Sequence, residues 1–354
     1  MTLQKSRICP CRDRQKLDVG SDCFYNVFDC WRDAVNVIQF RTLAGGRKIM
    51  KVLRIVLCLM GTICFLSAQA DTGNGLPIID MHMHAYPAGF NGEVNMPNPV
   101  TGKPSGVTSD EELLRATLTE MRRYHIVKAV ASGPLEFVLR WKSAEPKRII
   151  GGAYFDEATS LPDVERLRQH FMAGQLGVLG ELVAQHAGLS LADPLFEPYL
   201  ALAEELDVPV GIHTGLGPEG IPYACCPKFR VTYGNPISFE EVLLRHPKLR
   251  LYIMHGGWPY LEETKAIMSV YPQVYADLAV INWIIPREEF HEYLRGLIRA
   301  GLGKRIMFGS DQMVWPEAIG MAVEGIESAQ FLSREQKRDI FYNNAVRFLG
   351  LKEE

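Results

Sequence analysis

The sequence has no excess of basic residues, no apolar run long enough for a comfortable membrane span, and no glycine-rich fingerprint after its first predicted strand. With 38 Lys and Arg against 41 Asp and Glu, the 354 residues carry a formal net charge of −3, which gives no basic excess for binding nucleic acid. A transmembrane helix needs about 20 apolar residues. The composition, 47% hydrophobic and 22% charged, is that of a soluble globular protein and excludes a multi-span membrane chain. The missing fingerprint weakens a dinucleotide-binding fold.

Histidine is absent from the first 70 residues, and all nine histidines lie beyond them. Cysteine has the opposite distribution, because six of the eight lie in the first 70 residues and only Cys225 and Cys226 follow. The first 70 residues also hold 11 of the basic and 5 of the acidic residues, so the remaining 284 carry 27 positive and 36 negative charges. We therefore expect an acidic main part that contains all the imidazole chemistry.

Residues 50–70 have the organisation of a secretory signal peptide. A basic start, Met50–Arg54, precedes the apolar run Ile55–Leu66 and the small-residue end Ala68-Gln69-Ala70. The alternative is a membrane anchor that stays in the mature protein. Residues 1–49 show no periodicity that would bury a core, so we interpret them as an upstream extension. The sequence thus predicts a periplasmic or secreted protein that begins after Ala70, without stable membrane insertion after cleavage.

From Pro77 onward, short apolar runs alternate with stretches that have helical spacing, which is typical of parallel strands joined by helices. The predicted strands are Ile78–His82, Val127–Ser132, Ile149–Tyr154, Val178–Val183, Val210–His213, Leu249–His255, Val274–Leu278 and Arg305–Gly309. The clearest predicted helices are Asp110–His125, Asp163–Ala173, Phe196–Leu206, Phe239–Arg245 and Arg287–Ala300. Eight such units fit a single (β/α)8 TIM barrel over residues 71–354 better than an open doubly wound sheet. The irregular stretches 85–108 and 215–236 each follow a strand and are expected at the barrel mouth.

Side chains that bind metals end several of these strands. They are His82, His84, Glu181, His213, His255 and Asp311. His82 and His84 alternate on the first strand and therefore share one face, where two imidazoles can bind one divalent ion. Each residue alone has an ordinary alternative: His213 could be a core histidine and Asp311 a helix cap. Together, at the ends of separate strands, they favour a metal site at the mouth of the barrel.

The order and spacing of these residues resemble the amidohydrolase superfamily, in particular the amidohydrolase-related group of metal-dependent hydrolases and nonoxidative decarboxylases. The resemblance covers Pro77 to about Leu349. Its motifs are His82-x-His84, His213, His255-Gly256-Gly257, Gly309-Ser310-Asp311 and the closing Asn343-Asn344-Ala345-Val346-Arg347-Phe348-Leu349. These motifs do not identify the substrate.

The resemblance implies a divalent metal, with zinc as the first choice, bound by His82, His84, His213 and Asp311. It implies that Asp311 also accepts a proton and that His255 acts catalytically beside the metal. A divalent ion lowers the pKa of its water to about 7, a carboxylate can take the proton, and an imidazole can polarise a substrate carbonyl. No strand carries the lysine that some relatives use to bridge two metals, but Glu181 offers a further ligand. The number of ions, one or two, stays open.

Four residues near the predicted mouth are candidates for contacting substrate. Lys228 and Arg230 would suit an anionic substrate, and their alternative is a solvated loop. Tyr86 and Trp258, like Trp283 and Trp315, follow predicted strand ends and would either line the pocket or pack beneath it.

The remaining histidines and the two late cysteines have less definite interpretations. His125, His170, His246 and His291 are expected on solvated helix faces, whereas a mouth position stays open for His186. Cys225 and Cys226 could form a vicinal disulfide, pair between chains or remain free.

Two enzyme functions and one binding function are consistent with these residues. The first is a metal-dependent hydrolase that acts on an amide, ester or lactone of a small molecule. The second is a metal-dependent nonoxidative decarboxylase of a small unsaturated or aromatic acid. The third is a barrel that only binds a metal or a ligand, which the pair of His255 and Asp311 argues against. Export mildly favours hydrolysis, a homo-oligomer stays open, and the sequence does not name the substrate.

Overall fold

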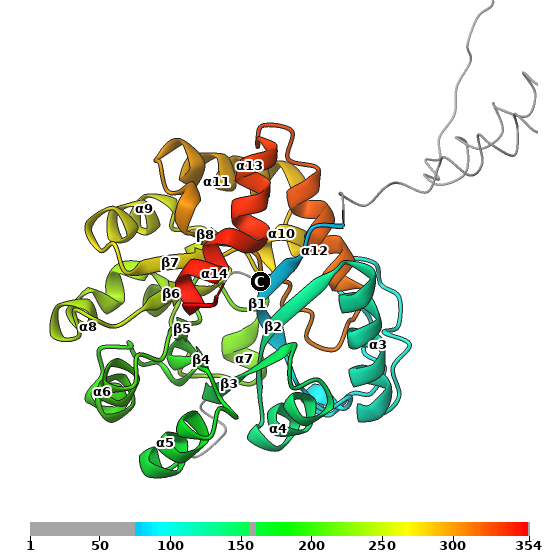
Figure 1. Cartoon of the computed structure of the whole chain (residues 1–354), viewed down its shortest axis with the longest axis horizontal. Coiled ribbons are helices and arrows are strands. Elements are labelled where there is room, and N and C mark those ends of the chain that lie inside the picture. Colours follow the sequence, from blue (N-terminus) through cyan, green and yellow to red (C-terminus); the bar gives the residue numbers. More distant parts are fainter. Residues whose placement is uncertain (1–74, 156–160, 353–354) are drawn as a thin grey trace, which may run out of the picture. The chain divides into compact units, whose positions relative to one another are not determined.

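A computed structural model describes residues 75–155 and 161–352, so the predicted upstream extension and signal peptide lie outside the described residues. Eight parallel strands pair in chain order, as a (β/α)8 TIM barrel requires (Figure 1). They are β1 (Ile78–His84), β2 (Ile126–Gly133), β3 (Ile149–Phe155), β4 (Val178–Leu182), β5 (Val210–Ile212), β6 (Leu251–Ile253), β7 (Val274–Asp277) and β8 (Ile306–Met307). All eight predicted strands are present, and the predicted barrel is confirmed.

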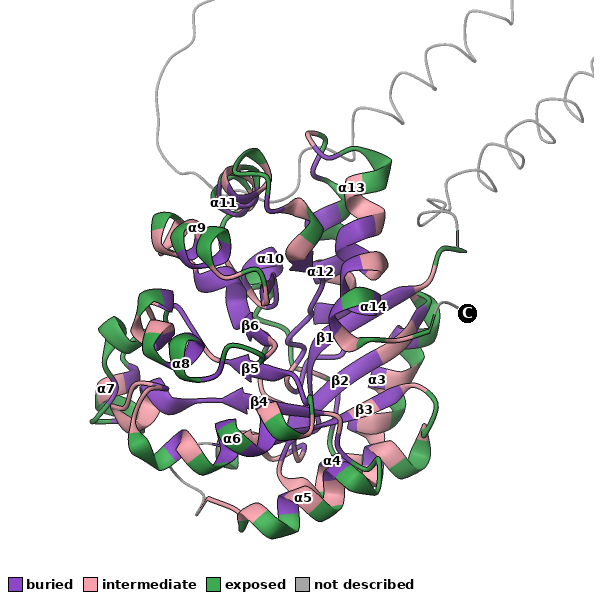
Figure 2. Ribbon diagram, turned by 60° about the vertical axis from the view of Figure 1, so that its left-hand side comes forward, coloured by how far each residue is buried: buried purple, intermediate pink, exposed green. Residues whose placement is uncertain are grey.

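Helices surround the ring of strands and turn their buried faces toward it (Figure 2). They are α3 (Asp110–Arg123), α4 (Leu135–Ala144), α5 (Val164–Met172), α6 (Glu197–Glu205), α7 (Ile221–Ala224), α8 (Glu240–Arg245), α9 (Leu261–Val270), α10 (Ile281–Ile284), α11 (Arg287–Arg299), α12 (Ala318–Glu327), α13 (Arg334–Arg338) and α14 (Asn344–Leu349). Short 3₁₀ turns are η2 (Phe90–Gly92), η3 (Ala184–Ala187), η4 (Pro194–Phe196), η5 (Val231–Gly234), η6 (Pro236–Phe239), η7 (Met254–Gly257) and η8 (Gly303–Arg305), and η9 (Asp339–Asn343) is a π-helix. None of the helices among the described residues has the length and apolar composition needed to cross a membrane.

Local sequence explains where the predicted helices begin. The Ser109 side chain accepts a hydrogen bond from the backbone N–H of Glu112, and three acidic residues fill the first turn of α3. Asp163 caps α5 by accepting from the backbone N–H of Arg166. Both features stabilise a helix N-terminus by satisfying free N–H groups and complementing the helix dipole.

Backbone hydrogen bonds bring the first and last strands together, so the barrel is nearly closed. Met81 N donates to Phe308 O at 2.9 Å, and Asp311 N donates to His82 O at 2.7 Å. The N-terminal end of the barrel is covered by α14, which lies across the strands in Figure 1 and packs Ala345, Val346 and Phe348 against inward-facing strand residues. At the C-terminal end of the barrel, where the strand-end residues lie, the loops that follow the strands surround the mouth.

Five strands, β4 to β8, are shorter than predicted, and the two largest differences, in β6 and β8, shape the site. The predicted strand Leu249–His255 ends at Ile253, because Met254–Gly257 form the turn η7 with His255 at φ 58°. The predicted strand Arg305–Gly309 is reduced to Ile306–Met307: Arg305 belongs to the turn η8, and the chain leaves the strand after Met307. The strand ends therefore turn early and direct their polar side chains over the mouth.

Candidate metal centre

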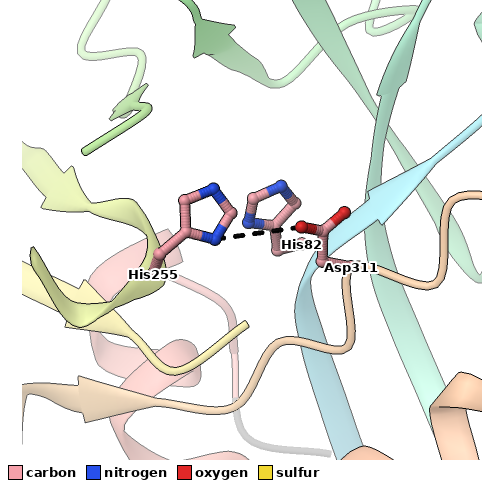
Figure 3. A group of neighbouring side chains, drawn as sticks. All are labelled: His82, His255 and Asp311. Carbon is pink, nitrogen blue, oxygen red and sulfur yellow. Dashed lines mark ion pairs between the residues drawn. The ribbon is translucent and has the colours of Figure 1, made fainter. Parts of the chain in front are cut away.

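The six residues predicted at strand ends converge at the C-terminal end of the barrel. His82 and His84 lie on β1 and Glu181 lies on β4. His213 directly follows β5, whereas His255 comes two residues after β6 and Asp311 four residues after β8. All are at most 5% exposed except His213, which is half-buried. Figure 3 shows the side chains of His82, His255 and Asp311, which come from three different strand ends and face one another.

The first group of donor atoms lies around β1, and we call it the first donor group. His82 Nε2 and His84 Nε2 are 3.2 Å apart. Glu181 Oε2 lies 3.7 Å from His82 Nε2 and 3.5 Å from His84 Nε2. Asp311 Oδ1 lies 3.0 Å from His84 Nε2, completing a set of two imidazoles and two carboxylates.

The other oxygen of Glu181 faces the second donor group, formed by His213 and His255. Glu181 Oε1 is 2.7 Å from His213 Nδ1 and 3.4 Å from His255 Nε2. The two ring nitrogens are 3.1 Å from each other. The structure thus divides the predicted ligands: His213 lies with His255 and Glu181, whereas His82 and His84 lie with Glu181 and Asp311. Among the described residues, three sets of three meet the spacing of a metal site: one in each group around Glu181, and a third, His82, His255 and Asp311, that spans the two groups.

Left-handed backbone aims the His255 side chain. His255, Gly256 and Gly257 have φ values of 58°, 61° and 75°, and the sharp turn lifts the imidazole from the end of β6 over the barrel axis. Only glycine fits at 257, since a Cβ there would lie 2.3 Å from Thr264 Oγ1. At the end of β8, a Cβ on Gly309 would lie 2.9 Å from the Cβ of His82. The His-Gly-Gly and Gly-Ser-Asp motifs therefore contain glycine because their backbone lies too close to neighbouring side chains for a Cβ.

Asp277, at the end of β7, orients two of the site histidines, and the sequence analysis missed it. Its Oδ2 accepts a hydrogen bond from His82 Nδ1 at 3.1 Å. Its Oδ1 accepts from the backbone N–H groups of His255 at 2.9 Å and Ala279 at 3.0 Å. Because Nδ1 of a neutral His82 donates, Nε2 keeps its lone pair and points into the first donor group. An acidic residue inside an otherwise apolar strand, Val274–Leu278, was the available signal.

The variant Asp277→Asn is expected to weaken metal binding by about 10–100-fold, the usual cost of losing a partner that orients a ligand. The amide oxygen would take over the two backbone N–H groups, so the NH2 group would face His82 Nδ1. That ring nitrogen would then have to accept, and the proton would move to Nε2, where it blocks the lone pair. Affinity for zinc is measured by competition with a chromogenic chelator, and far-UV circular dichroism reports the fold.

The matched control for Asp277→Asn is Asp207→Asn, which changes an exposed carboxylate paired with Arg250. It is expected to leave zinc affinity unchanged. Equal affinities of wild type and Asp277→Asn would contradict an orienting role for Asp277.

Three further residues hold the segment after β8 in place. Asp80 Oδ1 accepts from the backbone N–H groups of His82 and Ser310, both at 3.0 Å. Burial raises the pKa of Asp80 to about 7, although these hydrogen bonds oppose the rise. The indole of Trp283 donates to Ser310 O at 2.8 Å, and Gln312 clamps the backbone of His84 through both its oxygen and its nitrogen. Trp283 therefore packs beneath the site rather than lining it.

The carboxylates of the site are ionised despite their burial. Burial would raise the pKa of Asp311, but the neighbouring imidazoles outweigh it and hold that pKa at about 2. Burial likewise opposes ionisation of Glu181, yet hydrogen bonds from His213, His255 and His82 keep its pKa well below the usual value. Burial lowers the pKa of His82, but Asp311 and Asp277 raise it well above its ordinary value. The buried negative charge of these two carboxylates must therefore be compensated by positive charge close to them.

An aromatic wall stands beside the first donor group. The Tyr86 ring stacks on the His84 ring at 4.3 Å between centroids, and Phe90 stacks on the other side of Tyr86 at 4.1 Å. Tyr154 meets Tyr86 edge-on at 5.9 Å. These three aromatic residues line a cavity of about 350 Å³ with Gly133, Gly152 and Pro162. Tyr86 therefore both packs on a site histidine and lines a cavity next to it.

Among the described residues, the other three predicted substrate contacts form no hydrogen bond or ion pair with the donor groups. Lys228 is exposed, and so is Arg230, whose guanidinium donates to the carbonyls of Pro227 and Phe229 in its own loop. The indole of Trp258 donates to Glu289 on α11 at 3.0 Å. The role predicted for these side chains remains a prediction.

Cys225 and Cys226 are bonded to each other in the loop after β5, which selects the vicinal disulfide among the three alternatives. His186 lies near the mouth, with its ring 5.1 Å from the ring of His213. The expectation of a solvated face is wrong for His246, which is buried because it pairs with Glu197 and Glu204, both at 3.1 Å. Trp315 is also buried, and its indole donates to Met96 O.

Comparison with known proteins agrees with this geometry. The sequence model of the Amidohydrolase family (Amidohydro_2) matches residues 79–351. The chain therefore belongs to the amidohydrolase-related group, a class that suggests an enzyme acting on small molecules. Membership and the buried His/Glu/Asp cluster together suggest a divalent metal.

A curated relative matches only part of the chain. Protein fluG of Emericella nidulans is 22% identical over 161 residues, which make up 41% of this chain. The chain spans only 18% of the length of that relative.

Three solved structures have a similar fold. An uncharacterized TIM-barrel protein from Bordetella bronchiseptica has a TM-score of 0.60 at 18% identity, covering 78% of this chain and 99% of that chain. A probable 2-pyrone-4,6-dicarboxylic acid hydrolase from Acinetobacter baumannii has a TM-score of 0.55 at 14% identity, with 78% and 100% covered. A 2,6-dihydroxybenzoate decarboxylase from Rhizobium has a TM-score of 0.52 at 14% identity, with 77% and 98% covered. At these identities the likeness shows the fold alone.

Proposed function

We propose that the protein is a metal-dependent hydrolase that uses two divalent ions, bridged by Glu181, to cleave an amide, ester or lactone bond of a small molecule. One observation carries this proposal: the two oxygens of the buried Glu181 carboxylate face two different pairs of imidazoles. Zinc is our first choice because the donors are imidazole nitrogens and carboxylate oxygens.

The spacing of the donor atoms supports a metal in each group. Zinc–nitrogen bonds of about 2.0–2.1 Å place two ligands of one ion about 2.9–3.4 Å apart, for angles between 90° and the tetrahedral value. The distances from Glu181 to the four imidazoles and from Asp311 to His84, from 2.7 to 3.7 Å, bracket that range. Asp311 Oδ1 is buried, and among the described residues it has no hydrogen-bond partner, although His84 Nε2 is 3.0 Å away. Two atoms that lie close without a hydrogen bond are typical of ligands that share an ion.

The chain's own residues would divide the work as follows. His82, His84 and Asp311 would hold one ion, His213 and His255 the other, and Glu181 both. A bound divalent ion would supply a nucleophile at neutral pH by lowering the pKa of water to about 7. The second oxygen of Asp311, Oδ2, lies 3.8 Å from His255 Nδ1 and is placed to accept a proton and later return it to the leaving group. Tyr86 would limit the space beside His84 into which a substrate fits.

Metal analysis distinguishes whether His255 is a metal ligand or a purely catalytic residue. The sequence predicts a place beside the metal for this residue, whereas its distances to Glu181 and His213 favour a ligand of the second ion. We expect His255→Ala to bind one equivalent of zinc instead of two, measured by inductively coupled plasma mass spectrometry after dialysis. His291→Ala, on α11, is the control and should keep both. Full zinc content in His255→Ala would return this residue to a purely catalytic role.

The alternative reaction is nonoxidative decarboxylation of a small aromatic or unsaturated acid. The half-buried ring of Phe90, stacked on Tyr86 beside the first donor group, favours it, because a flat substrate would fit against this ring. A panel of carboxylated lactones, esters, amides and aromatic acids, assayed for both carbon dioxide and hydrolytic products, distinguishes the two reactions. Hydrolytic products lost on chelation and restored by zinc are expected. Carbon dioxide release would favour the alternative, and stoichiometric metal without any turnover would favour a binding protein.

We further propose that the enzyme works outside the cytoplasm. The organisation of residues 50–70 supports this. The catalytic domain would then comprise residues 71–354. N-terminal sequencing of the exported protein should read Asp71-Thr72-Gly73, and a mature protein that begins near Met1 would overturn the proposal.

A further inference from the structure

A second cavity lies at the opposite end of the barrel from the candidate metal centre. It has a volume of about 640 Å³, within the range of small-molecule sites. Its strand residues come from the beginnings of β1, β2 and β3, whereas the donor groups lie at or beyond strand ends. Lys142 of α4, the loop before β3, Tyr342 of η9 and the segment after α14 complete it. This cavity, which we call the basic pocket, is separate from the site of the proposed function.

Among the described residues, five cationic side chains line the basic pocket and no acidic side chain does. They are Lys128, Lys142, Lys147, Arg148 and Lys352. In a main part with 36 negative and 27 positive charges, five cations around one cavity stand out from the average surface. Among the described residues, the one carboxylate that forms an ion pair with this set is Glu145, 3.8 Å from Arg148 Nε.

Backbone carbonyl groups hold these cations without neutralising them. Lys142 Nζ donates to Pro146 O at 3.0 Å and to Ile149 O at 2.7 Å. Lys128 Nζ donates to Lys147 O at 3.3 Å, and Arg148 Nη1 donates to Ile126 O at 3.2 Å. Each carbonyl fixes the position of a cation but contributes no full negative charge, so the repulsion among the cations persists.

The electrostatics of Lys142 support an uncompensated positive field. Burial lowers its pKa, and the neighbouring charge of Lys128 lowers it further. An anion between these two side chains would reverse the second effect.

The rest of the lining is apolar. Ile79, Val127, Ile149, Ile150 and Leu351 line the pocket along with the ring of Tyr342. The guanidinium of Arg338 lies over this ring, 4.1 Å from its centroid, and fixes it. The pocket therefore offers charge at several points and an apolar surface between them, which suits an organic ion rather than a bare inorganic one.

We propose that the basic pocket binds a small organic anion that carries two or more carboxylate or phosphate groups. The ligand's acidic groups would pair with Lys128, Lys142 and Lys147, and its carbon skeleton would lie against Ile149 and Tyr342. Such an occupant would tie the starts of β2 and β3 to the segment that follows α14, and would thereby stabilise the closed end of the barrel.

The test is isothermal titration of the full chain with two probes, propane-1,2,3-tricarboxylate and inorganic pyrophosphate. We expect saturable binding of at least one probe, and a binding constant at least tenfold weaker in Lys147→Met and in Lys142→Met. Lys147 is exposed and its side chain makes no hydrogen bond in the described residues, so its variant should fold even if Lys142→Met does not. Lys248→Met and Lys265→Met remove the same charge elsewhere and should bind as wild type does.

The probes also separate this site from the metal centre and identify the ligand's acid. Pyrophosphate can bind metal, but binding at the metal centre would survive the lysine substitutions. Preference for the tricarboxylate indicates a carboxylate ligand, and preference for pyrophosphate a phosphate ligand. Absence of saturable binding at millimolar concentrations, or equal loss in the Lys248 and Lys265 controls, would overturn the proposal.

Discussion

Replacing Asp311 by asparagine is expected to reduce turnover by about 10²–10⁴-fold, the typical contribution of a positioned general acid–base group. In the proposed centre this carboxylate holds an ion through Oδ1 and moves a proton through Oδ2, and an amide does neither well. The backbone should tolerate the change, because residue 311 has a φ of 49° and asparagine adopts the left-handed region readily. The measurement is kcat on whichever substrate the panel identifies, with circular dichroism as the check of folding.

The control for Asp311→Asn is again Asp207→Asn, since it changes an exposed aspartate that also has positive φ. It is expected to keep the rate of the wild type. Near-normal turnover by Asp311→Asn would dismiss the proposed role of this carboxylate.

Replacing Glu181 by glutamine is expected to lower the zinc content from two equivalents to one. The neutral amide would present one oxygen and one NH2 group, so only one of the two donor groups would keep its oxygen ligand. The remaining group would lose both a ligand and a negative charge, and its ion would dissociate on dialysis. Metal analysis of the purified proteins provides the measurement, and Glu219→Gln, in the exposed part of the loop after β5, is the control.

Other zinc contents of wild type and Glu181→Gln would indicate other roles for Glu181. One equivalent in both wild type and Glu181→Gln would leave Glu181 as a pocket residue next to a single ion. Two equivalents in both proteins would show that the second ion does not depend on the bridging carboxylate.

The barrel and most of the candidate site could be predicted because both depend on local patterns. Each buried parallel strand is a short apolar run, and each site residue stands where such a run ends, as His82 and His213 do. The predicted extent of the strand before His255 was wrong, because the left-handed turn at Met254–Gly257 depends on packing of Gly257 against Thr264. The run of apolar residues that predicts a strand does not predict such tertiary contacts.

Residues that act through other residues were harder to predict. Asp277 orients His82 from a position 195 residues away, so only the folded barrel brings them together. The division of the histidines between the two oxygens of Glu181 could not be predicted from the sequence for the same reason. The basic pocket is formed by charges from β2, α4, the loop before β3 and the segment after α14, and no stretch of the sequence is strikingly basic there.

The central claim is that Glu181 joins two metal-binding groups, and anomalous diffraction at the zinc absorption edge tests it most directly. Crystals of the zinc-loaded protein should give two anomalous peaks on either side of the Glu181 carboxylate, one beside His82, His84 and Asp311 and one beside His213 and His255. A single peak bound by His82, His84, His213 and Asp311, with Glu181 uncoordinated, would contradict the account.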